Sequence, residues 1–419
     1  MKVLVVGSGA REHALVTALL RDASVDQVLC APGNAGIAQQ VPCAPLDVTN
    51  PSAIALLAVE CGADLVVIGP EVPLVAGAAD SVRAAGIACF GPSAQAAQLE
   101  GSKAFAKQIM IDAGVPTAQA RVCASIDAVD AAMTEFGAPF VIKDDGLAAG
   151  KGVIVTSDRD AALAHAAECL AKPGGSVVVE EFLDGPEVSL FAITDGTHVL
   201  PLQPAQDFKR VRDGDEGPNT GGMGAYSPLP WAPAELVDEV MRTVLQPTVD
   251  AMRERGTPFS GLLYAGLALT SRGVRVIEFN ARFGDPETQV VLARLRTPLA
   301  RVLLASATGS LADTGPLEWS TDAAVTVVLA AAGYPESPRT GDPIEGLAAA
   351  REVPGVSVFH AGTAAGADGQ IVSAGGRVLS VTAIGADLGQ ARERAYAALE
   401  RIHLEGAHHR SDIALTASS

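Results

Sequence analysis

The 419-residue sequence predicts an α/β protein, and two observations support this: its composition and its alternation of strands with helices. Aromatic residues make up only 4% of the chain and hydrophobic residues 48%, so the cores must be built largely from Val, Leu, Ile and Ala. Such cores are typical of alternating strands and helices rather than of β-sandwiches. The length indicates about two to four domains.

The first part of the chain has the alternation of βαβ units on a parallel sheet. The short apolar runs that predict strands occupy residues 2–6, 27–30, 64–69 and 87–90. The stretches between them that predict helices include 11–21, 52–61 and 74–85. We therefore expect an N-terminal parallel α/β domain over residues 1–102.

The next part predicts a second domain over residues 103–310 that carries a small lid subdomain. A helix begins near Lys103 and ends near Gly114, where a glycine followed by a proline gives the usual helix stop. From about 116 to 190 the pattern is strand, helix, strand, glycine loop, strand, helix, strand, as in a lid that closes over substrates. Residues 201–230 show little periodicity and predict a long functional loop.

Beyond this loop the pattern returns to larger α/β structure and then to a strand-rich tail. The elements expected here are a helix near 233–254, strands near 262–270 and 273–280, a helix near 286–305 and a linker over 309–316. Residues 320–419 then predict a C-terminal domain that packs on the others.

Charge and cysteine usage narrow the class of protein. The formal net charge of −18 argues against binding of nucleic acid, because phosphate neutralisation needs clustered Lys and Arg. The six cysteines form no CxxC pair, which indicates reduced thiols rather than a metal site or a disulfide framework. The N-terminus predicts a first strand rather than a signal peptide, and no uninterrupted apolar stretch has transmembrane length. We therefore expect a cytoplasmic protein that binds small molecules but no nucleic acid or membrane, as a monomer or, alternatively, a dimer.

In the segment 276–282 (VIEFNAR), polar residues alternate along a hydrophobic strand. Glu278, Asn280 and Arg282 recur at a spacing of two and so share one face. A carboxylate and an amide oxygen suit Mg²⁺ bound together with nucleotide phosphates, and a guanidinium neutralises a phosphoryl group in transfer. The segment predicts an ATP site without a Walker loop, and the alternative is a strand with one solvated face.

The turn at 7–13 (GSGAREH) follows a strand and opens a helix, so its backbone N–H groups and the helix dipole form an anion pocket. It matches a dinucleotide fingerprint only in part, because Glu12 stands at the third glycine position of GxGxxG. Arg11 and His13 instead suit a phosphorylated sugar. The alternative is that Arg11 only caps a structural turn.

The segment 143–152 (KDDGLAAGKG) places Lys143 at a strand end, before a glycine loop that suits polyphosphate. It differs from a Walker A loop, because Gly146 and Gly150 enclose three residues rather than four and a glycine follows Lys151. The alternative is a plain hairpin turn.

The segment 177–187 (VVVEEFLDGPE) is a buried strand that breaks into a short connection with acids at both ends, as at a domain hinge. Adenine bound at such a hinge would be read by backbone groups and by Glu180, while Glu187 accepts from ribose hydroxyls. The alternative is a turn of solvated acids.

A set of ordered motifs runs along most of the chain. They are GSGAREHAL (7–15), APGNAGIA (31–38), GPEVPL (69–74), LEGSKAFAK (99–107), IKDDGLAAGKGV (142–153), EEFLDGPEVSLF (180–191), QDFKRVRDGDEGPNTGGMGAYSP (206–228) and EFNARFGDPETQ (278–289). In order and spacing they resemble the glycinamide ribonucleotide synthetase (phosphoribosylamine–glycine ligase) family of the ATP-grasp superfamily. The resemblance implies an ATP-grasp fold with an N-terminal parallel-sheet (pre-ATP-grasp) domain, a small lid subdomain and a strand-rich C-terminal domain.

The resemblance also implies a reaction. ATP would drive the ligation of glycine to 5-phospho-β-D-ribosylamine through glycyl phosphate, giving glycinamide ribonucleotide, ADP and phosphate in de novo purine biosynthesis. An ATP-grasp carboxylase of the purine or biotin type is the alternative, and the segment 206–228 argues against it.

Matching positions imply the following roles. ATP phosphates would be held by Lys103, Lys143, Gly146, Gly150 and Lys151, and the nucleoside by Glu180, Glu181, Leu183 and Glu187. Mg²⁺ or Mn²⁺ would be held by Glu278 and Asn280, while the transferring phosphoryl group would be stabilised by Arg282. Glycine or the acyl phosphate would be oriented by Asp207, Lys209 and Asp285. Phosphoribosylamine would be held by Gly9, Arg11, Glu12, His13 and Asn34, beneath a moving loop that contains Gly222 and Gly224.

The sequence departs from the family pattern at two places. The strand segment 262–266 carries no acid, although many ATP-grasp enzymes place a further metal ligand there, so the number of metal ions stays open. After Gly333 and the following Tyr-Pro, Arg339 stands near the position where the family often has a lysine.

Overall fold

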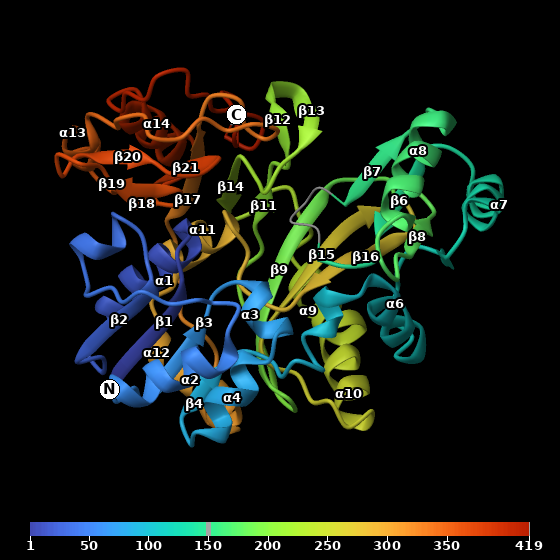
Figure 1. Cartoon of the computed structure of the whole chain (residues 1–419), viewed down its shortest axis with the longest axis horizontal. Coiled ribbons are helices and arrows are strands. Elements are labelled where there is room, and N and C mark those ends of the chain that lie inside the picture. The colour runs from blue at the N-terminus through green and yellow to red at the C-terminus, as the bar shows by residue number, and fades with distance from the viewer. Residues whose placement is uncertain (148–151, 419) are drawn as a thin grey trace.

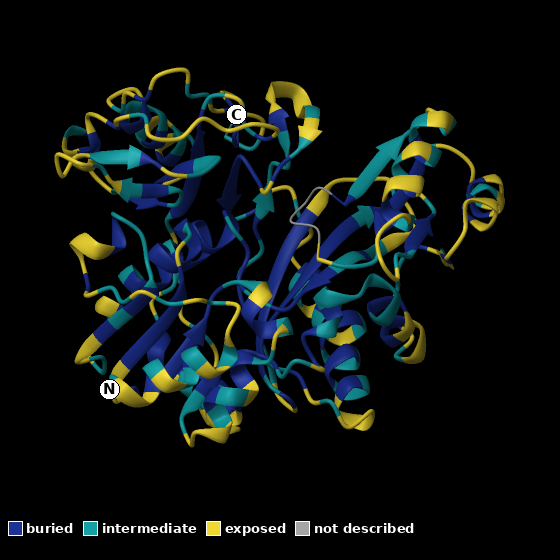
Figure 2. Cartoon of the chain, viewed as in Figure 1, coloured by how far each residue is buried: buried dark blue, intermediate teal, exposed yellow. Residues whose placement is uncertain are grey.

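The computed structural model describes residues 1–147 and 152–418 and confirms the α/β class (Figure 1). The N-terminal part and the strand-rich C-terminal part lie next to each other, and a central sheet separates them from a small sheet at the far side. Buried residues concentrate in the strands of these sheets (Figure 2). No helix within the described ranges is both long enough and apolar enough to cross a membrane.

The N-terminal sheet is parallel, with strand order β2-β1-β3-β4. Its strands are β1 (Lys2–Gly7), β2 (Gln27–Pro32), β3 (Leu65–Ile68) and β4 (Ala88–Phe90). Its helical segments are α1 (Ala10–Leu20), η1 (Ile37–Gln39), α2 (Pro51–Glu60), α3 (Glu71–Val75) and α4 (Ala78–Ala84). Side chains of β1 alternate between two hydrophobic clusters, because helices cover both faces. The single helix expected over 74–85 is wrong: Gly77 takes a left-handed φ of +92° and separates α3 from α4.

A small antiparallel sheet follows, with strand order β5-β8-β6-β7. Its strands are β5 (Ala120–Cys123), β6 (Phe140–Asp144), β7 (Val153–Thr156) and β8 (Val177–Glu180). Its helices are α7 (Ile126–Phe136) and α8 (Arg159–Leu170), and the helices before it are α5 (Gln98–Gly101) and α6 (Lys103–Asp112). The sheet has a hydrophobic cluster of its own, which includes Val129, Met133 and Ile142. The order of elements agrees with the lid pattern expected from the sequence.

The central sheet is antiparallel, with strand order β10-β9-β15-β16. Its strands are β9 (Glu187–Asp195), β10 (Val199–Pro201), β15 (Ser260–Thr270) and β16 (Gly273–Asn280). The helical segments around it are α9 (Leu236–Val240), the π-helical η3 (Met241–Leu245), α10 (Gln246–Glu254), α11 (Glu287–Arg294), α12 (Leu299–Thr308) and η4 (Leu311–Asp313). The single helix expected over 286–305 is wrong. The helix α11 ends at Arg294, because Leu295 has extended backbone and forms a β-bridge with Trp319, and α12 begins only after Pro298, which disfavours helical backbone at the residue before it.

The C-terminal sheet takes strands from two distant parts of the chain, in the order β11-β14-β17-β21-β18. These strands are β11 (Gln206–Asp207), β14 (Gly224–Ser227), β17 (Ala323–Ala330), β18 (Val356–His360) and β21 (Arg377–Gly385). The remaining elements are β12 (Arg210–Arg212), η2 (Asp213–Asp215), β13 (Glu216–Asn219), α13 (Leu347–Arg351), β19 (Thr363–Ala365), β20 (Ile371–Ser373) and α14 (Leu388–Leu399). The long loop expected over 201–230 therefore contains short strands. Of these, β11 pairs with β14, and β14 pairs with β17 from the C-terminal part, so a long-range pairing that local periodicity does not show holds them in the sheet.

Candidate active site

The polar end of β16 brings three predicted residues together. Glu278 and Asn280 lie on the same face, opposite Gly266 and Tyr264 of β15. Arg282 lies beyond the end of the strand, and its Nη2 donates to Oδ1 of Asn280 (3.2 Å). The spacing therefore predicted the neighbourhood correctly, although Arg282 is not itself part of the strand.

Several cations surround the carboxylate of Glu278. Burial would raise the pKa of this carboxyl, but the positive charges of Lys209, Lys143, Lys103 and Arg282 hold it below its ordinary value. Glu278 is therefore an ionised carboxylate within a positive field. Such a field suits a polyphosphate, which would meet the cations directly.

Arg282 is in turn held by carboxylates from the N-terminal part. Its Nε donates to Glu71 (3.1 Å) and its Nη2 pairs with Glu100 (2.9 Å). Glu100 also accepts from the backbone N–H of Ala281 (2.7 Å). Desolvation opposes the charge of Arg282, but the Glu100 and Glu71 carboxylates raise its pKa above the ordinary value. The guanidinium therefore stays charged and fixed in orientation.

Glu180 forms buried ion pairs with two lysines, Lys143 and Lys107, and sequence reasoning missed Lys107. Glu180 accepts from Lys143 Nζ (2.9 Å) and from Lys107 Nζ (3.1 Å), and all three residues are at most 5% exposed. Lys107 also donates to Thr117 Oγ1 (2.8 Å). Burial lowers the pKa of Lys107 to about 8, although Glu180 opposes this shift. The signal was present in the motif LEGSKAFAK, where Lys107 follows Lys103 by one helical turn.

The 143–152 segment and the 180–187 connection begin at the two members of the ion pair, Lys143 and Glu180. Lys103 Nζ donates to the backbone carbonyl of Gly146 (3.1 Å), while Gly150 and Lys151 lie outside the described residues. Glu181 accepts from the backbone N–H of Gln119 (3.1 Å) and pairs with Arg272. In residues 1–147 and 152–418, nothing hydrogen-bonds the backbone groups of Leu183. The hinge thus retains free backbone donors and acceptors.

A second charged group joins the predicted residues Asp207, Lys209 and Glu187. Lys209 pairs with Glu187 at 2.5 Å. Desolvation opposes its charge, but the Glu187, Asp207 and Glu278 carboxylates raise the pKa of Lys209 well above its ordinary value. Burial, together with the Glu287 and Glu187 carboxylates, raises the pKa of Asp207 to about 7, against the opposing charge of Lys209.

Glu287 is a further buried acid that sequence reasoning left without a role. It is 3% exposed and accepts from Tyr264 Oη (2.5 Å) and Ser189 Oγ (3.2 Å). Its partners come from β15 and β9, so only the tertiary pairing of these strands reveals the contact. Burial and the Glu287 charge raise the pKa of Tyr264 well above its ordinary value, so its hydroxyl stays a donor.

Within the turn at 7–13, Glu12 accepts hydrogen bonds from its neighbours. Glu12 is 1% exposed and accepts from the backbone N–H of Gly9 (2.6 Å) and from Nε of Arg11 (2.5 Å). A Cβ added at Gly69 would lie 1.9 Å from Oε1 of Glu12. A backbone donor that a dinucleotide pyrophosphate would use is therefore occupied. This geometry agrees with the weak dinucleotide match.

His13 and Asn34 connect this turn to the C-terminal part. Asn34 Nδ2 donates to the carbonyls of Ser8 and His360 (both 2.8 Å), and its Oδ1 accepts from two backbone N–H groups. His13 Nδ1 accepts from the backbone N–H of His360 (2.8 Å), so the proton of its neutral ring lies on Nε2. Burial lowers the pKa of His13 to about 3. Its Nε2 has no hydrogen-bond partner among the described residues.

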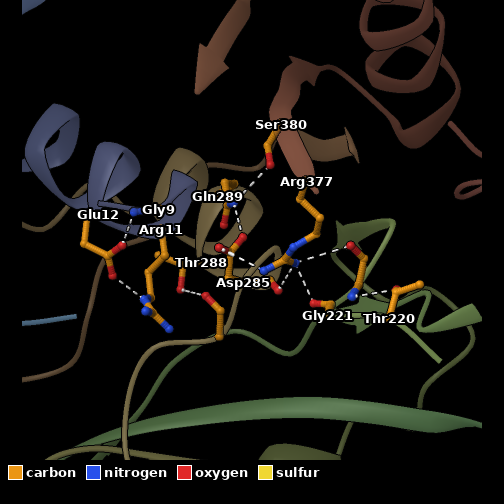
Figure 3. A network of polar contacts seen from close by, with 12 residues as sticks. Gly9, Arg11, Glu12, Thr220, Gly221, Asp285, Thr288, Gln289, Arg377 and Ser380 are labelled. Carbon is orange, nitrogen blue, oxygen red and sulfur yellow. Dashed lines mark hydrogen bonds and ion pairs between the residues drawn. The ribbon is translucent and has the colours of Figure 1, made fainter. Parts of the chain in front are cut away.

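Asp285 lies close to Arg377, the first residue of β21, and this arginine also contacts Gly221 of the 220–224 loop (Figure 3). Asp285 pairs with Arg377 (3.3 Å) and accepts from Gln289 (2.8 Å). Gly222 packs against Pro286, and Gly224 against the carbonyl of Thr326. The loop glycines therefore permit close packing in this conformation.

The donor set at the end of β16 suits a hard divalent cation. Glu278 offers a carboxylate and Asn280 an amide oxygen, both of which Mg²⁺ and Mn²⁺ accept. No cluster of three or more His, Cys, Asp or Glu that could hold a metal occurs in the part of the chain that the structure describes. Such a cation would therefore need further oxygens from nucleotide phosphates.

Comparison with known proteins decides the family. Residues 1–100 match the phosphoribosylglycinamide synthetase N domain, residues 101–288 its ATP-grasp (A) domain and residues 324–416 its C domain. A phosphoribosylamine–glycine ligase from Streptomyces coelicolor is 67% identical over 420 residues, which covers 100% of both chains. The chain belongs to the phosphoribosylglycinamide synthetase family. This confirms the resemblance inferred from the motifs. The chain is therefore a member of a family of ATP-dependent ligases.

Solved structures agree with the family and its fold. The phosphoribosylamine–glycine ligase from Thermotoga maritima is 32% identical, with a TM-score of 0.85 over 99% of this chain and 100% of that chain. The biotin carboxylase domain of 2-oxoglutarate carboxylase from Hydrogenobacter thermophilus is 19% identical, with a TM-score of 0.72 over 97% of this chain and 91% of that one. The second likeness extends to the fold alone.

Proposed function

We propose that this chain ligates glycine to 5-phospho-β-D-ribosylamine at the expense of ATP, as the names of its relatives state for those proteins. The observation that carries the proposal is the ionised Glu278 among Lys103, Lys143, Lys209 and Arg282, at the end of a central ATP-grasp strand. The products are glycinamide ribonucleotide, ADP and phosphate, and the reaction belongs to purine biosynthesis.

The chemistry of a carboxylate dictates two steps. Glycine cannot acylate an amine directly, because the leaving group would be oxide. Attack of its carboxylate on the γ-phosphorus forms glycyl phosphate and releases ADP, and the ribosylamine nitrogen then attacks the acyl carbon while phosphate leaves. The acyl phosphate must be kept from water between these steps, which is the expected role of lid closure.

The nucleotide would bind between the hinge and the lysines. Lys103 and Lys143, with the 146–151 loop, would hold the phosphates, and the free backbone groups of Leu183 would read adenine. Each carboxylate oxygen of Glu180 accepts from one lysine, and Glu180 would also accept from the exocyclic amine of adenine. Glu187 and Glu181 lie at the two ends of the same connection, where Glu187 would meet ribose.

A divalent cation, Mg²⁺ or Mn²⁺, would be held by Glu278 and Asn280 and would neutralise phosphate charge. Arg282 is placed beside them, and its guanidinium would stabilise the phosphoryl group during transfer. Asp207 and Lys209 suit the two charged ends of glycine, the ammonium and the carboxylate.

The first turn would receive phosphoribosylamine. Arg11 supplies positive charge. The buried Nε2–H of His13 is a donor without an acceptor among the described residues, and a phosphate or ribose oxygen would provide one. Glu12 and Asn34 use their hydrogen-bonding groups within the protein, so we assign them to shaping this turn. The domain boundaries, a monomeric state and a cytoplasmic location remain predictions.

Product formation tests the proposal. Phosphate release from Mg-ATP should require both glycine and phosphoribosylamine, which is generated in place because it is unstable, and glycinamide ribonucleotide should accumulate in equal amount. Release driven by bicarbonate without glycine would instead support the carboxylase alternative. Absence of release under both conditions would contradict the proposed ligase.

A further inference from the structure

Arg377 joins the C-terminal sheet to the proposed ligase site. It is the first residue of β21, and its Nη1 donates to the backbone carbonyls of Gly221 (2.5 Å), Asp285 (2.7 Å) and Gly222 (3.3 Å). Its Nη2 pairs with Oδ2 of Asp285 (3.3 Å). One guanidinium thus contacts acceptors in two segments that lie far from it in the sequence (Figure 3).

A second side chain holds the carboxylate of Asp285 from its other oxygen. Gln289 Nε2 donates to Oδ1 of Asp285 (2.8 Å) and to Oγ of Ser380 (3.4 Å), which also belongs to β21. Gln289 is 1% exposed, so this contact is shielded from water. Each oxygen of the Asp285 carboxylate therefore has its own donor. Arg377 belongs to β21, and Gln289 is linked to β21 by its hydrogen bond to Ser380.

Close packing leaves the convergent segments little freedom. Gly222 has a φ of +108°, and a Cβ at this position would lie 2.4 Å from Cδ of Pro286. A Cβ at Gly221 would lie 3.0 Å from Cζ of Arg377. The loop, the 285–286 turn and the guanidinium therefore fix one another's positions.

The Asp285 carboxylate also lies beside the first turn. A Cβ added at Gly9 would lie 3.5 Å from Oδ2 of Asp285, the oxygen that pairs with Arg377. This turn is where the amine substrate would bind, so Asp285 can accept a hydrogen bond from that amine. The ATP residues Lys103 and Lys143 have no contact with Arg377 among the described residues.

We propose that Arg377 is a positioning residue for the amine step: it holds Asp285 and the Gly221–Gly222 carbonyls so that the ribosylamine nitrogen is directed at the acyl carbon. The inference rests on the proposed ligase function. Arginine is required because its planar fork serves several acceptors at once, whereas a lysine ammonium is a single point charge. The resemblance implied that Asp285 orients glycine or the acyl phosphate. In our proposal Asp285 instead orients the amine, so formation of the acyl phosphate does not depend on Arg377.

The test is Arg377→Gln in the full-length enzyme, with Arg377→Lys as the conservative variant. For Arg377→Gln, kcat/KM for phosphoribosylamine should fall about 10²-fold, the loss typical of a misplaced reacting group. KM for ATP should stay within about twofold. Phosphate released per glycinamide ribonucleotide should rise above one, because glycyl phosphate waits for its amine and hydrolyses. Arg377→Lys should give intermediate values of both quantities.

Arg392→Gln is a matched control. Arg392 lies on α14 and also donates to backbone carbonyls of the C-terminal part, those of Ile413 and Ser411. Among the described residues it has no contact with Asp285 or the 220–224 loop. Its substitution should leave the ratio of phosphate to product at one. A merely structural role of Arg377 would lower stability and all kinetic constants together without moving this ratio.

Three outcomes would overturn the inference. The first is an Arg377→Gln enzyme with unchanged kcat/KM for phosphoribosylamine and one phosphate released per glycinamide ribonucleotide. The second is an equal loss of kcat/KM for ATP and for phosphoribosylamine in both Arg377→Gln and Arg377→Lys. If Arg377→Gln fails to fold, the ratio measured for Arg377→Lys decides by the same criterion. The third is a wild-type chain that forms no glycinamide ribonucleotide at all, which would overturn the proposed function as well.

Discussion

Arg282 illustrates how this site sets charges against one another at the scale of single residues. Its guanidinium lies between the carboxylates of Glu71 and Glu100 and beside Asn280, and its side chain is 18% exposed. Burial raises the pKa of Glu100, although Arg282 opposes this, so the acid depends on its partner for ionisation. The arginine therefore has two separable effects, on turnover and on stability.

Arg282→Ala should leave ATP binding nearly unchanged and lower turnover about 10²-fold or more, because a charge that acts on the transferring phosphoryl group is lost. It should also lower the free energy of unfolding by about 3 kcal/mol, because two acids lose their cation. The double variant Arg282→Ala/Glu100→Gln should recover much of the stability and none of the turnover. Recovery of both in calorimetry and steady-state kinetics would assign Arg282 a structural role only.

Asp207 predicts a pH dependence. Its pKa is raised to about 7, so near neutral pH a large fraction of molecules carry a proton that blocks pairing with the glycine ammonium. We expect kcat/KM for glycine to rise about tenfold per pH unit below 7 and to level off above about 8. Asp207→Asn should be slow and should lose this limb of the profile. The same limb in the Asn variant would mean that another group titrates.

The same shift affects stability with the opposite sign. The folded carboxyl of Asp207 has a pKa near 7, against about 3.9 for an unfolded Asp. The folded state then binds the proton more tightly, so this contribution to stability is present below about pH 4 and is lost as the pH rises through 7. The site therefore gains activity over the range in which this residue costs stability.

Local spacing predicted some site residues and could not reveal others. The period of two along a strand placed Glu278 and Asn280 together correctly. Other contacts of the site, such as those of Glu71 with Arg282, Glu287 with Tyr264 and Arg377 with Asp285, join distant segments. No sequence pattern around these residues specifies such pairs, because the fold alone brings them together.

At the scale of elements, the β1–α1 turn is shaped by the contact between Glu12 and glycines from two strand ends. A Cβ at Gly7 would lie 2.6 Å from Cγ of Glu12, and one at Gly69 would lie 1.9 Å from its Oε1. The acid lies across the ends of β1 and β3 and fixes the entry of α1. This packing explains why an acid can replace the third glycine of a dinucleotide turn.

Gly69→Ala should therefore lower the free energy of unfolding by about 1–3 kcal/mol, as overpacking of a tight site does, and should weaken phosphoribosylamine binding because Glu12 is displaced. Gly389→Ala is the control: Gly389 lies in the helix α14 and has no positive φ, and an added Cβ there would lie 3.3 Å from Oδ1 of Asp387 and 3.8 Å from the carbonyl oxygen of Ser418. Alanine there should be neutral or slightly stabilising. Equal melting temperatures for the two variants would contradict the proposed role of the Glu12 contact.

Element boundaries were predictable where the signal is local. The parallel strands, α6 and the lid alternation all follow apolar runs and helix stops in the sequence. The strands β11 and β14 were not, since each is short and is stabilised by pairing within the C-terminal sheet. A helical pattern also hid the two interruptions, one at Gly77 and one over 295–298.

At the scale of the whole molecule, the proposed site collects residues from every part of the chain. The N-terminal part supplies the first turn and the acids that hold Arg282, the central sheet supplies Glu278, and β21 supplies Arg377. The C-terminal sheet includes strands from the 206–227 segment, and one of them, β11, carries Asp207, which binds glycine in our proposal. The arrangement accounts for a two-step reaction in which different parts of the molecule serve each step.

Transfer of oxygen from glycine to phosphate tests the central claim most directly. Glycine labelled with ¹⁸O in its carboxylate is incubated with Mg-ATP, phosphoribosylamine generated in place and the enzyme, and the released phosphate is examined by mass spectrometry. The account predicts one ¹⁸O atom in each phosphate, because the glycine carboxylate attacks the γ-phosphorus and its C–O bond later breaks. Unlabelled phosphate formed together with glycinamide ribonucleotide would contradict the glycyl phosphate mechanism.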